Sequence, residues 1–281
     1  MGPGLISIHL KNHFESIMTS DVPKQLTKQI KELQPWHHDI QLFDDFSTGL
    51  VFSPDRKLAP AENDGVSLIS PRKRFLAQLD RIYPDGMGNK SFLDCACNGG
   101  GYCFWSRERD IARGVGFDVR EHWIRQAKWT QTHRTSYPTD RLEFHVLDLY
   151  NLPDMGYEPF DMTYFSGIFY HLPDPITGLK IAADLTSDVL VLNTAMMLDS
   201  NNPRGLTMAR ESRTKVMSGV HQLSWFPTGK ETLRDILLWL DFKDLKVTMF
   251  NEPKDTRRCR IEIFAARDKG RLGGLDGESL T

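Results

Sequence analysis

The sequence predicts an α/β fold in which helices cover both faces of a mostly parallel sheet. Over residues 71–193, short apolar runs typical of strands alternate with amphipathic runs typical of helices. Near the end of the chain, two strand-like runs follow each other without an intervening helix, which predicts an antiparallel hairpin. The 281 residues suffice for one such domain of about 200 residues and an added segment.

The added segment is residues 1–70. An amphipathic stretch from Leu26 to Leu33 precedes an aromatic, turn-rich passage from Pro35 to Phe46. This mixture is typical of a lid or cap rather than of a separate domain. We therefore expect a helical and irregular N-terminal cap that packs on the main domain.

The main domain is expected over residues 71–268. A helical pattern follows Pro71, and Asp174 with Pro175 is a typical N-cap and first-turn pair for a later helix. Strands are expected at 91–96, 114–119, 142–149, 160–166 and 189–193, with helices at 103–111, around 123–127 and from 175 onward.

The regular pattern lapses over residues 194–227, where we expect an insertion on the substrate side of the sheet. Thr228 with Glu231 three residues later is a capping-box pattern for the last helix. Strand-like runs at 245–249 and 261–265 then form the expected hairpin. The Gly-rich, polar residues 269–281 are expected to be disordered.

The composition disfavours several classes of protein. Lys and Arg total 35 against 37 Asp and Glu, so the net charge of −2 gives no general attraction to nucleic acid or anionic lipid. The apolar runs are short and the first residues lack a secretory pattern, so we expect a cytoplasmic chain without membrane contact. Four unevenly spaced cysteines predict reduced thiols and no metal site.

The first candidate binding feature is a strand that runs directly into a glycine turn. Residues 92–101 read Phe-Leu-Asp-Cys-Ala-Cys-Asn-Gly-Gly-Gly. In an open parallel sheet, ligands bind beyond the carboxyl ends of the strands, and small residues let them approach the backbone closely. A tight turn without a ligand is the alternative explanation, because a glycine-rich loop alone is a weak motif.

Two acidic residues at later strand ends add to this feature. Asp118 ends the second strand, where a carboxylate can accept two hydrogen bonds from a ribose diol. Asp148 ends the third strand, where an acceptor can meet the exocyclic amine of adenine. Each residue alone can be explained as a helix N-cap. Their joint spacing favours a nucleoside site.

These features together resemble the class I S-adenosylmethionine (SAM) dependent methyltransferases, which have a Rossmann-like sheet. The resemblance covers roughly residues 90–267 and rests on residues 94–101, Asp118, Asp148 and the strand that begins Phe160-Asp161. It implies SAM as cofactor, with the first loop against the methionine part, Asp118 at the ribose and Asp148 at the adenine. The residues expected at SAM are Asp94, Ala96, Asn98, Gly99, Gly100, Asp118, Val119, Asp148, Leu149 and Ser166.

The chain departs from the family pattern at two positions of the first loop. The family usually has glycine where this chain has Ala96 and Asn98. Asparagine tolerates a left-handed backbone, so Asn98 can keep the turn. The methyl group of Ala96 makes the approach of a ligand tighter.

A narrower resemblance is to the branch that contains the tRNA wobble-uridine methyl and carboxymethyl transferases. It rests on residues 94–100, on Gly-Ile-Phe-Tyr-His-Leu-Pro-Asp-Pro at 167–175 and on Pro-Trp-His-His-Asp-Ile at 35–40. Carboxymethylating members need cationic side chains for the extra carboxylate of carboxy-SAM. His37 and His38 stand here in place of a fixed cation, so we expect ordinary SAM. Arg257 or Arg258 of the final hairpin is the alternative source of that charge.

Tyr170 and His171 follow the fourth strand and are the candidate catalytic residues. Methyl transfer from a sulfonium is an in-line displacement, in which an enzyme aligns the reactants and supplies a base. We expect Tyr170 to orient the acceptor and His171 to be that base, with packing and turn-capping roles as the alternative. The residues expected to line the acceptor pocket are Trp36, His37, His38, Tyr170, His221 and Trp225.

The favoured function is therefore methylation of an oxygen, nitrogen or carbon atom in a small or medium-sized metabolite. Modification of a tRNA wobble uridine is the second enzymatic hypothesis, and a catalytically inactive SAM-binding partner protein is the third. A nicotinamide oxidoreductase is less favoured. Its fingerprint requires a third glycine at the start of the helix, which the segment from Cys103 to Trp105 lacks.

Overall fold

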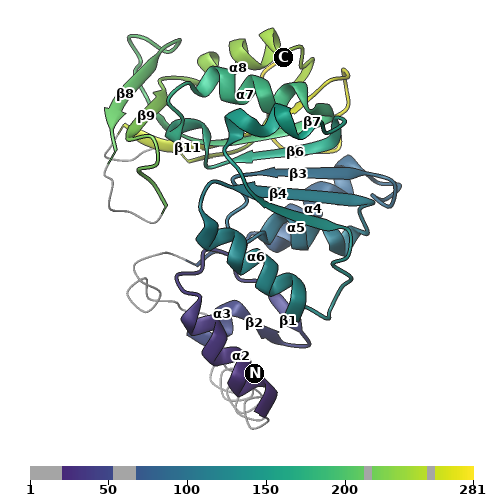
Figure 1. The fold of residues 1–281 in the computed structure, drawn as a ribbon. Coiled ribbons are helices and arrows are strands. Elements are labelled where there is room, and N and C mark those ends of the chain that lie inside the picture. The colour runs from purple at the N-terminus through teal and green to yellow at the C-terminus, as the bar shows by residue number, and fades with distance from the viewer. Residues whose placement is uncertain (1–20, 53–67, 212–216, 252–256) are drawn as a thin grey trace, which may run out of the picture.

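The computed structural model describes residues 21–52, 68–211, 217–251 and 257–281 (Figure 1). Its main feature is an eight-stranded sheet with the order β12-β10-β11-β7-β6-β3-β4-β5. These strands are β3 (Ser91–Cys95), β4 (Arg113–Asp118), β5 (Leu142–Val146), β6 (Phe160–Ser166), β7 (Thr186–Met197), β10 (Asp244–Asn251), β11 (Arg258–Ala266) and β12 (Glu278–Ser279). Neighbouring strands from β5 to β7 pair in parallel, whereas β11 is antiparallel to β7 and β10. The predicted mostly parallel sheet with a C-terminal hairpin is confirmed.

Helices connect the strands and cover both faces of the sheet. The α-helices are α2 (Asp21–Glu32), α3 (Thr48–Phe52), α4 (Arg72–Ile82), α5 (Gly101–Ser106), α6 (Glu121–His133), α7 (Pro175–Asp184) and α8 (Lys230–Trp239). The remaining short elements are η2 (Arg107–Arg109), η3 (Leu149–Met155) and η4 (Phe169–His171) and the strands β1 (Gln41–Phe43), β2 (Phe46–Ser47), β8 (Leu206–Arg210) and β9 (Leu223–Pro227). None of the described helices is long and apolar enough to cross a membrane.

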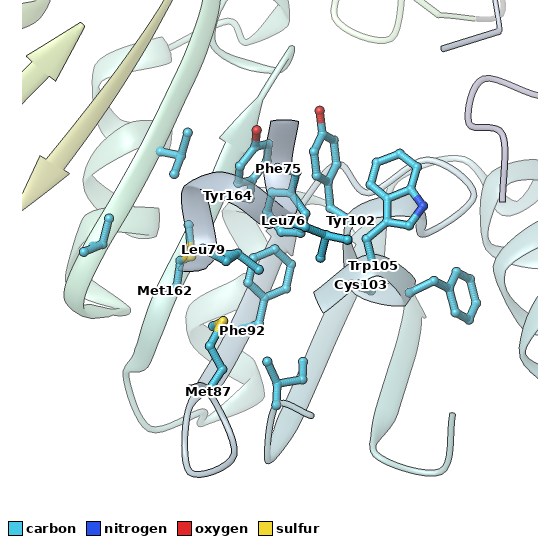
Figure 2. Packing of buried hydrophobic residues seen from close by; sticks show 14 of the residues in the cluster. Phe75, Leu76, Leu79, Met87, Phe92, Tyr102, Cys103, Trp105, Met162 and Tyr164 are labelled. Carbon is cyan, nitrogen blue, oxygen red and sulfur yellow. The ribbon is translucent and has the colours of Figure 1, made fainter. Parts of the chain in front are cut away.

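The central strands are apolar on both faces because helices cover both. Phe92 and Leu93 are neighbours in β3 and are both fully buried, but they belong to opposite sides of the sheet. Phe92 packs with Phe75 of α4 and with the aromatic residues of α5, among them Trp105 (Figure 2). Leu93 belongs to the cluster of Leu179 in α7. The sheet is therefore packed between two hydrophobic cores, one on each face.

The winding direction of the sheet reverses at β3. The chain passes from β3 through α5 to β4 on one side, and β6 lies on the other side of β3. Connections that leave in opposite directions open a crevice beyond the carboxyl ends of the two adjacent strands. The fold thus places a ligand-sized space where the glycine turn and the acidic strand ends converge.

The described part of the N-terminal segment lies against α6 (Figure 1). Leu26 and Ile30 form the buried face of α2, as their helical spacing predicts. Gln126 of α6 donates from Nε2 to the carbonyl oxygens of Leu33 (2.6 Å) and Pro35 (2.7 Å). These hydrogen bonds hold the passage after α2 on the main domain, where it reaches the crevice.

Residues 194–227 are more regular than the sequence indicates. β7 continues to Met197, and β8 and β9 form a separate antiparallel ribbon. The capping box at Thr228 is wrong, because α8 begins at Lys230 with Gly229 at its N-cap. The Thr228 hydroxyl instead accepts a hydrogen bond from the backbone N–H of Gly205 at 2.9 Å. Thr228 therefore joins the two ends of the β8–β9 ribbon by hydrogen bonding and does not cap α8.

Residues 269–281 are not the disordered tail that the sequence predicts. Leu272 and Leu275 are buried in the same cluster as Ile82 of α4. β12 then pairs with β10 at the edge of the sheet. Burial of each leucine contributes roughly 1.5–3 kcal/mol, which offsets the conformational freedom of the glycines around them.

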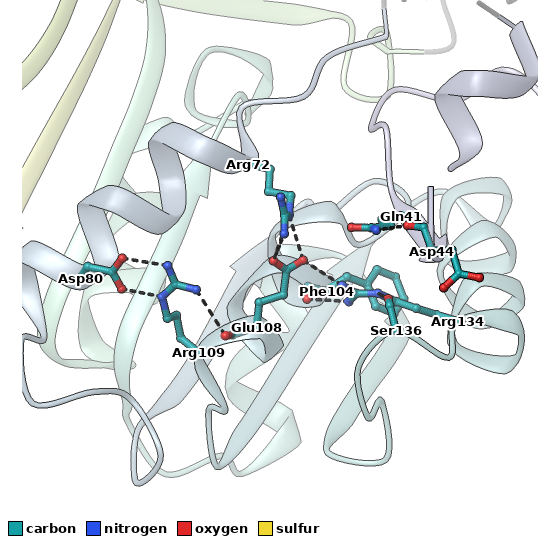
Figure 3. Close-up of polar contacts among 9 residues, drawn as sticks. All are labelled: Gln41, Asp44, Arg72, Asp80, Phe104, Glu108, Arg109, Arg134 and Ser136. Atoms are coloured by element: carbon teal, nitrogen blue, oxygen red, sulfur yellow. Dashed lines mark hydrogen bonds and ion pairs between the residues drawn. The ribbon is translucent and has the colours of Figure 1, made fainter. Parts of the chain in front are cut away.

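A buried carboxylate joins α4, η2 and the end of α6 (Figure 3). The side chain of Glu108 is 1% exposed and accepts hydrogen bonds from Arg72 Nε (2.9 Å) and Arg134 Nη2 (2.9 Å). The neighbouring pair of Arg109 and Asp80 is far more exposed. Glu108 therefore fixes the helices that flank the crevice on one face of the sheet.

Candidate functional site

A cavity of about 470 Å³ lies beyond the carboxyl ends of β3, β4, β5 and β6. Its walls come from the loop after each of these strands, from η4 and from the passage at His37 and His38. Residues 217–221 line another side of it. The predicted cofactor residues that line the cavity are Asp94, Ala96, Asn98, Asp118, Val119, Asp148, Leu149 and Ser166.

The loop after β3 turns sharply because alternate residues are left-handed. φ is +58° at Ala96, +52° at Asn98 and +80° at Gly100. Ala96 and Asn98 line the cavity, whereas Gly99 and Gly100 do not. A Cβ atom at Gly100 would lie 2.7 Å from the ring of Phe144. The structure therefore explains Gly100 by packing beneath the loop, although the sequence predicts a cofactor contact there.

Asp118 presents a buried carboxylate to the cavity. It is 3% exposed and accepts hydrogen bonds from the backbone N–H groups of Asn98 (3.2 Å) and Arg120 (3.0 Å). Burial raises the pKa of Asp118, and the bonds from Arg120 and Asn98 and the charge of Arg120 oppose that rise. Both oxygens keep a further lone pair for a ligand.

Asp94 lies beside it and has an unsatisfied oxygen. The residue is 2% exposed, and its Oδ2 atom is buried without a hydrogen-bond partner in the described structure. Burial, followed by the nearby charge of Asp118, raises the pKa of Asp94 well above its usual range. A buried acceptor of this kind in a cavity wall fits a ligand that brings a hydrogen-bond donor or a positive charge.

Asp148 serves as an N-cap and also faces the cavity. β5 ends at Val146, earlier than predicted, and Asp148 Oδ1 accepts the backbone N–H of Tyr150 (3.0 Å) at the start of η3. His221 Nε2 lies 3.8 Å from its Oδ2 atom. The N-cap explanation and the binding explanation are therefore compatible at this position.

The two candidate catalytic residues lie on η4 at one end of the cavity. The ring of Tyr170 stacks on Phe226 at a centroid distance of 5.8 Å. His171 Nδ1 lies 2.5 Å from Oε1 of Glu211. Burial lowers the pKa of His171, while Glu211 acts in the opposite direction and Arg120 and Arg260 add to the lowering. The balance favours a neutral imidazole, which a general base requires.

Guanidinium groups also line the cavity, although the sequence does not predict them as site residues. Arg74 and Arg260 both line the cavity. Arg260 Nε donates to Asn193 Oδ1 (2.6 Å), and Arg74 Nη2 donates to Glu262 Oε2 (2.8 Å). Asn193 Nδ2 also donates to Glu262 Oε2 at 3.1 Å, and Glu262 is fully buried. Hydrogen bonds therefore hold both cations in fixed positions.

The final hairpin places a different arginine at the cavity from those that the sequence suggests. Arg257 and Arg258 do not line the cavity, and the Arg258 guanidinium lies 5.8 Å from the centre of the Phe226 ring. Arg258 and Arg260 lie on the same face of β11, two residues apart, and pair with Met197 and Ala195 of β7. Which of them lies at the cavity therefore depends on the register of β11 with β7.

Three predicted acceptor residues from the cap and the insertion reach the cavity, namely His37, His38 and His221. His38 Nδ1 accepts the backbone N–H of Gly101 (3.3 Å), and burial lowers the pKa of His38 well below its usual range. Trp36 and Trp225 lie outside the cavity. Their indole N–H groups donate to the backbone oxygens of Ile30 (2.9 Å) and Pro173 (3.1 Å). A packing role explains Trp36, which is fully buried in the core of the cap, whereas the half-buried Trp225 connects β9 to the segment after η4 through its hydrogen bond.

The described side chains of the site form no cluster typical of a metal centre. The described residues contain no group of three or more His, Cys, Asp or Glu side chains that could hold a metal ion. All four cysteines are free, and burial raises the pKa values of Cys95, Cys97 and Cys103 well above their usual range. Carboxylates, guanidinium groups and four histidines are the main charged or titratable groups that line the cavity.

Comparisons with known proteins find relatives by sequence and by structure. No protein-family model matches the chain. It is 26% identical over 162 residues to a tRNA U34 carboxymethyltransferase of Nautilia profundicola, covering 56% of this chain and 49% of that protein. It is 28% identical over 176 residues to the enzyme of that name from Campylobacter hominis, covering 59% and 57%. The chain thus spans about half the length of these curated relatives.

Among solved structures, the N-terminal domain of EvdMO1 in the presence of SAH and D-fucose superposes with a TM-score of 0.67 at 17% identity. This match covers 88% of our chain and 97% of that domain. A second structure of the domain with SAH bound gives a TM-score of 0.68. With the sheet order and the position of the cavity, these likenesses identify the fold as that of the class I SAM-dependent methyltransferases.

Proposed function

We propose that this chain binds SAM in the cavity and transfers its methyl group to a small or medium-sized metabolite. The observation that carries the proposal is the pair of buried carboxyl groups, Asp94 and Asp118, at the point where the sheet reverses its winding. SAM has a ribose diol, an ammonium group and a sulfonium, all of which suit an acidic wall. The unsatisfied oxygen of Asp94 supports the same choice.

Different residues of the cavity wall would bind different parts of SAM. Asp118 would accept hydrogen bonds from the ribose hydroxyls, and Asp148 would meet the adenine amine. Asp94 and the backbone of the loop at Ala96 and Asn98 would hold the methionine end. Bound SAM supplies an electrophilic methyl group, so the chain itself must orient the acceptor and remove its proton where there is one.

Tyr170 and His171 are suited to the acceptor end. They lie on η4, beyond the end of β6, and both face the cavity. A neutral His171 can accept a proton, and the Tyr170 hydroxyl can donate to or accept from the bound acceptor. Together they support proton removal and alignment, the contributions that an in-line methyl transfer requires.

Asp118→Asn tests the assignment of the ribose site by calorimetry with SAM. We expect the dissociation constant to rise about tenfold to a hundredfold, because charge-assisted hydrogen bonds to the ribose are lost. Asp174→Asn is the matched control: Asp174 also accepts a backbone N–H, from Thr177 at 3.2 Å, but lies outside the cavity. It should leave the affinity unchanged. Equal affinities of the wild type and Asp118→Asn would show that the ribose lies elsewhere.

A second candidate function is carboxymethyl transfer to a tRNA wobble uridine. The similarity to tRNA U34 carboxymethyltransferases supports it, and so does Arg260 in the cavity wall. From sequence alone, SAM is the preferred donor because His37 and His38 stand in place of a fixed cation. Arg260 and Arg74 supply permanent charges of the kind that a carboxylate on the donor requires.

A competition titration of SAM against carboxy-SAM separates the two candidates. Under the first proposal, SAM binds at least as tightly as carboxy-SAM at neutral pH. A preference of tenfold or more for carboxy-SAM, abolished by Arg260→Ala, would favour carboxymethyl transfer. Arg258→Ala is the control, because this arginine belongs to the same strand but lies outside the cavity.

A further inference from the structure

The Glu211 carboxylate connects three segments around the end of the cavity. Its Oε1 atom lies 2.5 Å from His171 Nδ1 and accepts a hydrogen bond from Ser224 Oγ at 3.2 Å. Its Oε2 atom accepts the backbone N–H of Gly219 at 2.7 Å. Glu211 follows directly after β8, and its side chain is 11% exposed. One side chain thus joins η4, the β8–β9 ribbon and the segment that contains Gly219.

The bond to Glu211 determines which nitrogen of His171 carries the proton. An ionised carboxylate only accepts hydrogen bonds, so a neutral His171 must carry its proton on Nδ1. The lone pair is then on Nε2, the other ring nitrogen. His171 lines the cavity, so the tautomer that Glu211 selects is the one that leaves Nε2 able to take a proton.

The same carboxylate holds part of the cavity wall. Gly219 belongs to residues 217–221, all of which line the cavity. Arg120 makes a second connection to this segment, because its Nη2 atom donates to the carbonyl oxygen of Ser218 at 2.9 Å. Glu211 therefore links the position of this wall to the orientation of the His171 ring.

The charged groups around His171 come from separate elements. Glu211 stabilises the protonated ring, whereas Arg120 after β4 and Arg260 on β11 destabilise it. Tyr170 lies against the ring at a centroid distance of 4.0 Å. Removal of the Glu211 charge would leave the two arginines and the effect of burial unopposed, and the pKa of His171 would fall further.

We propose that Glu211 is a positioning residue, which fixes the Nδ1–H tautomer of His171 and at the same time holds residues 217–221 against the cofactor cavity. The catalytic meaning of this role rests on the proposed function, in which His171 is the base. The tautomer and the attachment of Gly219 are properties of the protein alone, so they can be tested without an acceptor.

Nuclear magnetic resonance of ¹⁵N-labelled imidazoles in the full chain, without ligand, tests the proposal. His171→Gln assigns the ring among the nine histidines. In Glu211→Gln we expect a lower pKa of His171 and a mixture of tautomers, because an amide can either accept from the ring or donate to it. Ser224→Ala removes a neighbouring hydrogen bond but keeps the carboxylate, and should change neither property.

Calorimetry with SAM tests the attachment of the cavity wall. We expect Glu211→Gln to weaken SAM binding threefold to tenfold, the effect of one lost hydrogen bond, and Ser224→Ala to leave it unchanged. If Glu211→Gln does not fold, Glu211→Asp keeps the charge but shortens the side chain, and it should also mix the tautomers. An unchanged tautomer and pKa in the variant that folds would overturn the proposal. Failure of the wild type to bind SAM would instead overturn the proposed function.

Discussion

Ala96 occupies a backbone conformation that favours glycine, at the point where the first loop meets the cavity. Its φ of +58° is in the left-handed region, where the Cβ atom of an ordinary residue crowds the backbone. The cost of this conformation is about 1–2 kcal/mol for a residue other than glycine. Strain of this kind tends to persist at ligand sites, where the surrounding structure enforces it.

Ala96→Gly should therefore stabilise the protein. Relief of the strain exceeds the extra chain entropy of glycine, of roughly 0.5–1 kcal/mol, so we expect the free energy of unfolding to rise by up to about 1 kcal/mol. Urea denaturation measures it. Ala127→Gly in α6 is the control, because this buried helical residue should lose stability on the same change. A loss of stability in Ala96→Gly would mean that the packing of the Ala96 methyl group contributes more free energy than the backbone strain costs.

At the residue scale, the sequence could predict the positions that depend on local pattern. Ala96, Asn98 and Asp118 belong to strand ends, and strand ends of a parallel sheet converge wherever the rest of the chain goes. Arg260 depends on the register of β11, and Trp225 depends on the path of the β8–β9 ribbon. Neither the register of β11 nor the path of the ribbon is encoded in neighbouring residues. The sequence therefore does not predict Arg260 at the cavity, and it wrongly predicts Trp225 there.

At the scale of elements, the Glu108 carboxylate is a buried polar connection between helices on one face of the sheet. Arg134 and Glu108 have almost no exposed side-chain surface, at 0% and 1%. Removing one partner of a buried ion pair leaves an uncompensated charge, which is far more costly than loss of an exposed pair. The two kinds of pair lie side by side in Figure 3.

Glu108→Ala should lower the free energy of unfolding by about 3–5 kcal/mol, because the Arg134 guanidinium remains buried without its carboxylate. Asp80→Ala removes the exposed partner of Arg109 and should cost no more than about 1 kcal/mol. Chemical denaturation of both variants provides the comparison. Similar losses in the two would indicate that water reaches Arg134 and replaces the carboxylate.

The order of elements was predictable because hydrophobic periodicity is local, whereas several boundaries were not. Asp174 does cap α7, since its Oδ1 atom accepts the backbone N–H of Thr177. Thr228 has the same kind of sequence signal, but Asn202 and Gly205 use its hydroxyl instead. The prediction of disorder for residues 269–281 was wrong for a related reason. Their glycine-rich composition indicates disorder, but composition does not reveal that Leu272 packs in the cluster that contains residues of α4.

At the scale of the whole molecule, the cavity is assembled from parts that are distant in sequence. The cap contributes His38, the sheet contributes Asp118, and the final hairpin contributes Arg260. Contacts between α6 and the cap, such as those of Gln126, determine where His38 lies. Cavity-lining residues at strand ends, such as Asp118, could therefore be inferred from sequence, whereas Arg260 required the structure.

The distribution of charge over the whole molecule bears on the choice between a metabolite and a tRNA. The net charge is −2, and many surface cations are paired with acids, as in Arg109–Asp80, Arg113–Glu143 and Lys180–Asp184. Arg74, inside the cavity wall, is paired with Glu262. Such an arrangement produces little long-range attraction for a polyanion.

We therefore expect unselected tRNA to bind weakly, with a dissociation constant no tighter than the micromolar range at physiological salt. Fluorescence anisotropy with labelled bulk tRNA, repeated between about 50 and 200 mM salt, measures both the affinity and its salt dependence. A protein that neutralises several phosphates loses affinity steeply over this range, because each contact releases condensed counterions. A metabolite enzyme should show weak binding with a shallow slope. Tight binding with a steep slope would mean that cations gather into a phosphate-binding surface despite the balanced total, and would favour the tRNA function over the metabolite one.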